Sequence, residues 1–138
     1  MKYLLITFLF FAMLLTASDS TLESSIYKAI SIDLTKSEKP KIYIYKEIVS
    51  LQKYHNNIEV VAKCEDAEII VISTLNEFPG NCNGKIVLGS RYAHLKDKRV
   101  VGSFFWQKGR PNIVFYADRL AEHNITLSED FQKYVEHD

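Results

Sequence analysis

The side chains best suited to metal binding or redox chemistry in this chain are two cysteines and four histidines. The histidines are His55, His94, His123 and His137. None has the i, i+4 spacing of a helical zinc site, so we expect them at helix ends or on the surface. Cys64 and Cys82 lack the C-x-x-C spacing that lowers the pKa of a redox thiol. The spacing therefore favours neither a metal site nor a catalytic thiol.

Motifs of known catalytic machinery do not occur elsewhere in the sequence. There is no G-x-S-x-G elbow, no G-x-G-x-x-G turn and no phosphate-binding P-loop. The acidic pairs Glu65-Asp66 and Glu129-Asp130 are adjacent in sequence, which is typical of surface and helix-capping residues. We therefore expect no catalytic residue, no metal and no cofactor, and an enzyme of unknown class remains an alternative.

The stretch "GSFFWQKGRPNIVFY" (102–116) contains the only tryptophan and the densest group of aromatic residues. Tryptophan and arginine are over-represented among residues that carry binding energy. One hypothesis is therefore a hairpin that displays Trp106, Lys108 and Arg110 to a partner, with Trp106 and Arg110 paired across the turn. The alternative is that a terminal helix covers the second face and the rings only fill a core.

The N-terminus has the pattern of a secretory signal. Lys2 precedes an apolar run from Leu4 to Leu15, and Thr16-Ala17-Ser18 supplies small residues for a signal peptidase. The run is short for a membrane span, although an uncleaved anchor is the alternative. We predict a signal peptide at 1–17, cleavage after Ala17, and a periplasmic or otherwise secreted protein with no integral membrane segment after cleavage.

Export changes the expectation for the two cysteines, because disulfides form in oxidising compartments. Cys64 lies four residues before the apolar run 68–73, and Cys82 lies three residues before the apolar run 85–90. If these runs are neighbouring parallel strands, both cysteines lie at the same edge of the sheet. We therefore predict a disulfide between Cys64 and Cys82, with two free buried thiols as the alternative.

The remaining pattern alternates helices and strands in what we expect to be one domain, residues 18–138. Helices are expected at 22–34, 46–57, 90–97 (capped by Ser90), 117–123 and from Ser128, with Phe131, Tyr134 and Val135 on the inner face of the last one. Strands are expected at 41–45, 58–61, 68–73, 85–90, 99–106 and 112–116. This order predicts an α/β fold: a small, mostly parallel sheet flanked by helices, with a C-terminal antiparallel hairpin and a terminal helix.

Charge limits the kind of partner. Lysine and arginine number 17, as do aspartate and glutamate, so the formal net charge is zero. No basic stripe stands out, which argues against nucleic acid or an anionic membrane as the main partner.

From Cys64 to residue 135 the order of parts resembles the YfiR-like family of small periplasmic regulators. That family has a signal peptide, a cysteine before a buried strand, and a hairpin followed by a "gLxiSs"-type turn into a C-terminal helix. Here the turn is "NITLS" (124–128), with Asn124 in the place of a glycine, and the returning strand "NIVFY" matches the family's "RFEIN". Asn112 stands where arginine is usual, so no contact of that arginine is carried over.

The resemblance implies a periplasmic protein that binds and restrains an inner-membrane signalling protein, as a dimer and with sensitivity to thiol redox state. A protein partner at the envelope, or self-association through the hairpin edge, is then expected. Pro111 lacks an N–H and is expected at the start of an edge strand, which suits such pairing. Since the fold also resembles half of a two-lobed solute-binding protein, a single-lobe solute-binding protein is the other alternative.

Overall fold

The computed structural model describes the backbone of residues 2–138 and the side chains of residues 19–80 and 82–138. The predicted signal peptide, 1–17, lies outside the residues whose side chains are described, so its presence and its cleavage after Ala17 remain predictions. Within the described residues, none of the helices combines the length and the apolar character needed to span a bilayer.

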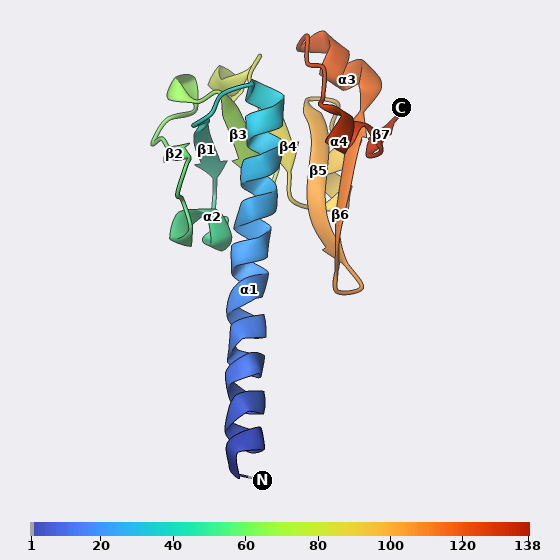
Figure 1. The fold of residues 1–138 in the computed structure, drawn as a ribbon. Coiled ribbons are helices and arrows are strands. Elements are labelled where there is room, and N and C mark those ends of the chain that lie inside the picture. The colour runs from blue at the N-terminus through green and yellow to red at the C-terminus, as the bar shows by residue number, and fades with distance from the viewer. Residues whose placement is uncertain (1) are drawn as a thin grey trace.

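The described residues form a seven-stranded sheet in the order β2-β1-β3-β4-β5-β6-β7. The strands are β1 (Lys41–Tyr45), β2 (Glu59–Val60), β3 (Ile69–Ile72), β4 (Ile86–Gly89), β5 (Val100–Gln107), β6 (Arg110–Tyr116) and β7 (Val135–Glu136). All neighbouring strands are parallel except β5 and β6, which form an antiparallel hairpin. The predicted α/β fold, with its mostly parallel sheet and C-terminal hairpin, is confirmed (Figure 1).

Helices and 3-10 turns flank this sheet. They are α1 (Lys2–Thr35), α2 (Val49–Lys53), α3 (Ala117–Glu122), α4 (Glu129–Gln132), and the 3-10 turns η1 (Cys64–Asp66), η2 (Gly80–Cys82) and η3 (Tyr92–Lys96). Helix α1 crosses one face of the sheet (Figure 1). Tyr27, Ile30 and Leu34 form its buried stripe, because steps of three and four residues return to the same side of a helix. Leu22 and Ala29, which belong to the apolar spacing that predicts this helix, are exposed.

Two separate clusters of apolar side chains form the core, one on each face of the sheet. The cluster under α1 includes Ile42, Ile69, Leu88 and Phe104. The cluster on the other face includes residues from β3 and β4 together with the two cysteines; its members are Tyr45, Cys64, Ile70, Ile72, Cys82, Val87 and Val100. Because β3 is buried on both faces, it is apolar at every position.

A bulge in β5 adjusts the strand to these two faces. Val87 pairs with Val100, but the next residue, Leu88, pairs with Gly102, so Val101 is the extra residue. Val101 and Phe104 therefore join the same cluster, which regular alternation would not allow at a spacing of three. At Gly102, a Cβ would collide with the ring of Phe115 on the opposite strand, so this position requires glycine.

Several predicted helices differ from the structure. The segment expected as a helix at 46–57 is helical only at Val49–Lys53. Ser90 does not cap a helix at 90–97: η3 has no side-chain cap, and the Ser90 hydroxyl donates instead to the carbonyl of Ile72, 2.7 Å away. Asn124 has a φ of 55°, the left-handed conformation expected there.

The terminal helix is one turn long. It ends at Gln132, so Tyr134 and Val135 are not on its inner face as predicted. The chain instead forms β7, which pairs with β6 through Phe115 and Tyr116. The backbone N–H of Phe115 donates to the carbonyl of Tyr134, 2.9 Å away. This bond explains why Tyr134 and Val135 still pack against the core.

Candidate functional site

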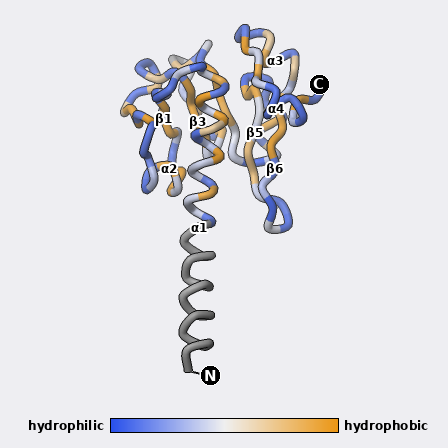
Figure 2. Tube along the Cα trace, in the orientation of Figure 1, coloured by the Kyte–Doolittle hydropathy of each residue, from blue (hydrophilic) through white to orange (hydrophobic). Residues whose placement is uncertain are grey.

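The hairpin between β5 and β6 has a two-residue turn whose geometry follows from its sequence. Lys108 and Gly109 have φ values of 53° and 74°. Two successive residues with positive φ match the right-handed twist of the flanking strands, and glycine takes this conformation without a steric cost. Lys108, Gly109 and Arg110 are all exposed, as predicted. The tip is the hydrophilic end of the hairpin (Figure 2).

Trp106 lies beside α1 near this tip. Its indole Nε1 donates a hydrogen bond to Oε1 of Glu23, 2.8 Å away, and its side chain remains 39% exposed. The Trp106 ring centroid is 5.9 Å from that of Phe104, which in turn lies 4.8 Å from Tyr27 in an edge-to-face contact. A row of aromatic rings thus continues from the core to the surface. Glu23 holds the outermost ring in one orientation.

A cavity of about 360 Å³ opens between the hairpin and α1, lined by Asp19, Ser20, Glu23, Trp106 and Gly109. Two carboxylates therefore stand on the α1 side, while Lys108 lies at the tip. Burial, and after it the negative charge of Glu23, raises the pKa of the Tyr27 hydroxyl; a hydrogen bond with Ser90 acts in the opposite direction. Asp19 and Glu23 make the α1 wall of the cavity acidic. We call the exposed surface formed by Asp19, Glu23, Trp106, Lys108 and Arg110 the tip surface.

The predicted pairing of Trp106 with Arg110 across the turn is wrong. Trp106 pairs with Pro111, and Arg110 pairs with Gln107. Because successive residues of a strand point to opposite faces, Trp106 lies on the α1 side of the ribbon and Arg110 on the other. A partner would have to contact both faces of the hairpin tip to reach both side chains.

The predicted edge position of Pro111 is confirmed for this part of β6. Strand β7 pairs only with Phe115 and Tyr116, so residues 110–114 of β6 have a neighbouring strand on the β5 side alone among the described residues. Proline suits such an edge because its missing N–H would otherwise have faced solvent.

The terminal helix does not cover the outer face of the hairpin. Phe131 of α4 contacts Phe115, on the same face as Phe104, with ring centroids 6.3 Å apart. On the other face Phe105 is buried against Tyr92 of η3, with centroids 5.6 Å apart. The hairpin thus contributes to the core from both faces and still projects an exposed tip.

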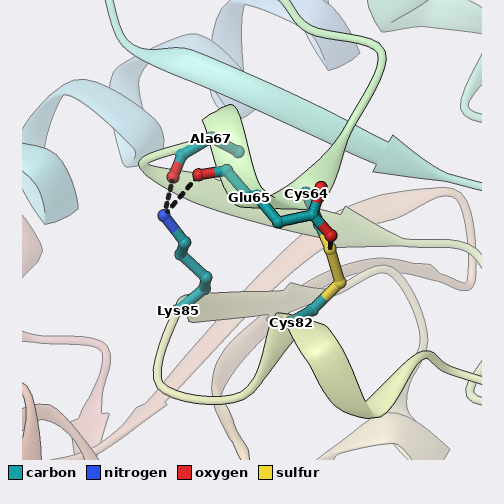
Figure 3. Close-up of a disulfide and its surroundings, with 5 residues drawn as sticks. All are labelled: Cys64, Glu65, Ala67, Cys82 and Lys85. Carbon is teal, nitrogen blue, oxygen red and sulfur yellow. Dashed lines mark hydrogen bonds between the residues drawn. A yellow bond between two sulfur atoms is a disulfide. The ribbon is translucent and has the colours of Figure 1, made fainter.

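Cys64 and Cys82 form the predicted disulfide (Figure 3). Their Cα atoms are 5.7 Å apart, because η1 and η2 precede the neighbouring parallel strands β3 and β4. The Lys85 ammonium donates to the carbonyls of Glu65 and Ala67, at 3.0 and 2.8 Å, and so adds a second link between the same two segments.

Polar side chains at the carboxyl ends of β1 and β3 make hydrogen bonds to the backbone of the loops that follow these strands. Parallel sheets of this order bind ligands at the point where the strand order reverses, here between β1 and β3. At this point the Ser73 hydroxyl donates to the carbonyl of Tyr45 and accepts from the N–H of Glu47. The Tyr45 hydroxyl donates to the carbonyl of Asn76, 2.6 Å away. These groups therefore serve the loops and are not directed toward a ligand.

Sequence patterns did not indicate that His94 is buried. Its Nδ1 accepts a hydrogen bond from the N–H of Ser90, 3.0 Å away, so the proton of the neutral ring lies on Nε2. Burial, followed by the nearby charge of Arg91, lowers the pKa of His94. The only available signal was its place four residues after Ser90, since a short loop brings such residues together.

Arg119 is a further buried polar residue that the sequence did not reveal. Its Nη1 donates to the carbonyls of Leu95, Asp97 and Val100, and its Nη2 donates to Asp138, 2.9 Å away. Its guanidinium carbon lies 4.3 Å from the centre of the Tyr116 ring. Arg119 therefore joins α3, η3, the start of β5 and the chain end beyond β7.

Among the described residues, no group of three or more histidine, cysteine, aspartate or glutamate side chains is arranged to hold a metal ion. His55, His94, His123 and His137 lie in different parts of the chain. No family model, no curated protein and no solved structure matches this sequence.

Proposed function

We propose that this chain is an exported, non-catalytic binding protein that contacts a protein partner through its tip surface. The observation that carries the proposal is Trp106: its indole donates a hydrogen bond to Glu23, yet more than a third of the residue stays exposed. A rigid, partly exposed tryptophan loses little conformational entropy on binding, which is the property of residues that dominate interfaces.

Charge and shape support the same surface. Asp19 and Glu23 line an acidic cavity, whereas Lys108 and Arg110 add cations at the exposed turn. Opposite charges on neighbouring sides of one protrusion favour a partner that receives the tip in a groove of complementary charge. The resemblance to YfiR-like regulators suggests that this partner is the outer portion of an inner-membrane signalling protein.

Periplasmic or other extracytoplasmic location belongs to the proposal as well. The apolar segment with its small-residue end suits a signal peptide, and a disulfide is compatible with an oxidising compartment. Cell fractionation and intact-mass measurement of the exported protein test this location. A mature protein beginning at Ser18 is expected, and a retained Met1 in the membrane fraction would contradict it.

The interaction is tested with a photocrosslinking amino acid placed at Lys108 in cells. We expect one dominant adduct with a membrane-embedded envelope protein, and loss of this adduct in Trp106→Ala and Arg110→Glu variants. The same crosslinker at Lys98, exposed at the opposite end of β5, is the matched control. Equal adducts from both positions would refute the proposal, and a self-adduct alone would replace it with dimerisation through the β6 edge.

A further inference from the structure

A second cavity lies at the end of β5 opposite to the tip surface. It has a volume of about 510 Å³ and is bordered by the η2–β4 connection, the residue before β5 and the end of α3. A volume of this size is within the range of small-molecule sites, roughly 300–1,000 Å³. The tip surface cannot contribute to it, because the whole length of β5 separates the two.

Apolar groups line the inner part of this cavity. Val87 and Cys82 are almost completely buried, and Phe78 packs against the same cluster. The disulfide holds this wall in place from η1, so the apolar surface is already formed before any ligand binds (Figure 3). A ligand with a flat, aromatic part would pack well against Phe78 and Val87.

Two cationic side chains, Lys85 and Arg99, lie at the rim of this cavity. The Lys85 ammonium is half-buried and donates to two neutral carbonyls, and it takes part in none of the ion pairs among the described residues. An ammonium has three donors, so one remains for a ligand. Burying a charge without a counter-charge is costly, and an anion placed beside Lys85 would relieve that cost.

Arg99 provides a second, pre-positioned cation. Its Nε and Nη2 donate to Asp97, at 3.0 and 2.7 Å, and its guanidinium carbon lies 5.3 Å from the centre of the Phe78 ring. Hydrogen bonds from Arg99 lower the pKa of Asp97, so this anchor stays ionised. The Nη1 edge has no hydrogen-bond partner within the described part of the chain. Glu122 is the one carboxylate lining the cavity, and Asp97, which pairs with Arg99, does not line it.

We infer that this cavity binds a small organic anion with an apolar or aromatic body. The anionic group lies between Lys85 and Arg99, and the body lies over Phe78 and Val87. The imidazole of His123, at the end of α3, supplies a further hydrogen-bonding group on the opposite wall. Such a ligand would bind independently of any protein held at the tip surface.

The test uses three probes that share one ring system: 1-naphthalenesulfonate, neutral 1-naphthalenemethanol and cationic 1-naphthylmethylamine. Each is titrated into the full domain while backbone amide signals are followed by NMR. We expect the sulfonate to shift the amides of residues 83–87 and His123, and to bind about tenfold more tightly than the other two, the ratio for one charge-assisted hydrogen bond.

Variants locate the binding. Arg99→Gln and Lys85→Met should each weaken sulfonate binding about tenfold, as loss of one bond to a charged group does. Lys98→Gln removes a neighbouring exposed charge that does not line the cavity and should change nothing, and Arg110→Glu should likewise bind as wild type. If Lys85→Met does not fold, Arg99→Gln decides alone. Equal binding of all three probes, or shifts at the hairpin tip instead, would overturn the inference.

Discussion

Two buried polar residues, His94 and Arg119, make hydrogen bonds to backbone groups around η3. His94 accepts the N–H of Ser90 directly after β4, and Arg119 donates to three carbonyls around η3. Buried backbone groups without hydrogen bonds are costly, so each side chain stabilises a short loop that has little regular structure of its own. Both residues therefore have consequences for stability that can be measured.

Stability should depend on pH through His94. The folded protein lowers the pKa of this histidine below its ordinary 6.5, so the neutral ring is favoured in the fold. The contribution of neutral His94 to the free energy of unfolding is complete when the pH is above the pKa of the unfolded state. It is lost as the pH falls through 6.5 toward the lower pKa of the folded state. Urea unfolding of wild type and His94→Asn between pH 7.5 and pH 5 measures it. The stability of wild type should fall more steeply toward pH 5 than that of His94→Asn. An identical dependence of stability on pH in both proteins would contradict this role of His94.

Replacing Arg119 by methionine should destabilise the protein by about 3 kcal/mol, since losing the bonds to the buried carbonyls of Leu95 and Val100 costs roughly 1–3 kcal/mol each, whereas the Asp97 carbonyl keeps a backbone N–H. Asp138→Asn is the matched control. Its carboxylate is partly exposed, so losing the ion pair should cost only about 0–1 kcal/mol. Thermal or urea unfolding of both variants gives the comparison. Similar losses would mean that the ion pair, and not the three carbonyl bonds, is the important contact.

At the scale of elements, the β5–β6 hairpin combines a rigid base with an exposed turn. At its base the side chains of Phe104 and Phe105 are buried on opposite faces, and a bulge at Val101 fits the strand to the core. Local pattern predicted the hairpin, the turn and the parallel neighbours β3 and β4, because alternation, glycine position and apolar run length are local properties.

Contacts between distant segments were beyond such patterns. Trp106 and Glu23 are 83 residues apart, and nothing in either segment alone indicates their hydrogen bond. Strand β7 has two residues, too few for any alternation to be recognised. The register that places Arg110 opposite Gln107 depends on the two-residue turn, and a turn one residue longer would have changed it.

The turn itself can be tested with two substitutions of opposite expected sign. Gly109→Ala should destabilise by about 1 kcal/mol, the cost of a Cβ in the left-handed region, since no atom lies near enough to add a clash. Lys108→Asn should stabilise by roughly 0.5 kcal/mol, because asparagine tolerates positive φ and Asn-Gly suits this turn type. Denaturant midpoints of the two variants should move apart. Movement in the same direction would argue against this turn geometry.

At the scale of the whole molecule, the Cys64–Cys82 disulfide joins the two segments that lead into β3 and β4. Cys82→Ser should lower the free energy of unfolding by about 2–4 kcal/mol, the usual effect of opening a loop of this length. A Cys64→Ser, Cys82→Ser double variant should match reduced wild type in the same unfolding experiment. Wild type whose stability does not change on reduction would show that the bond contributes nothing.

The position of α1 has a consequence for the order in which the protein can fold. The helix supplies Tyr27, Ile30 and Leu34 to the core, and Asp33 accepts the N–H of Ser128, 95 residues further along the chain. During synthesis, the contacts of α1 with β5 and with Ser128 can therefore form only when almost the entire sheet has been made. Until then the face beneath it is apolar and uncovered, a surface that holding chaperones bind. Complete docking of α1 should be a late, slow event, since contacts of such long sequence separation carry a large entropic cost of loop closure.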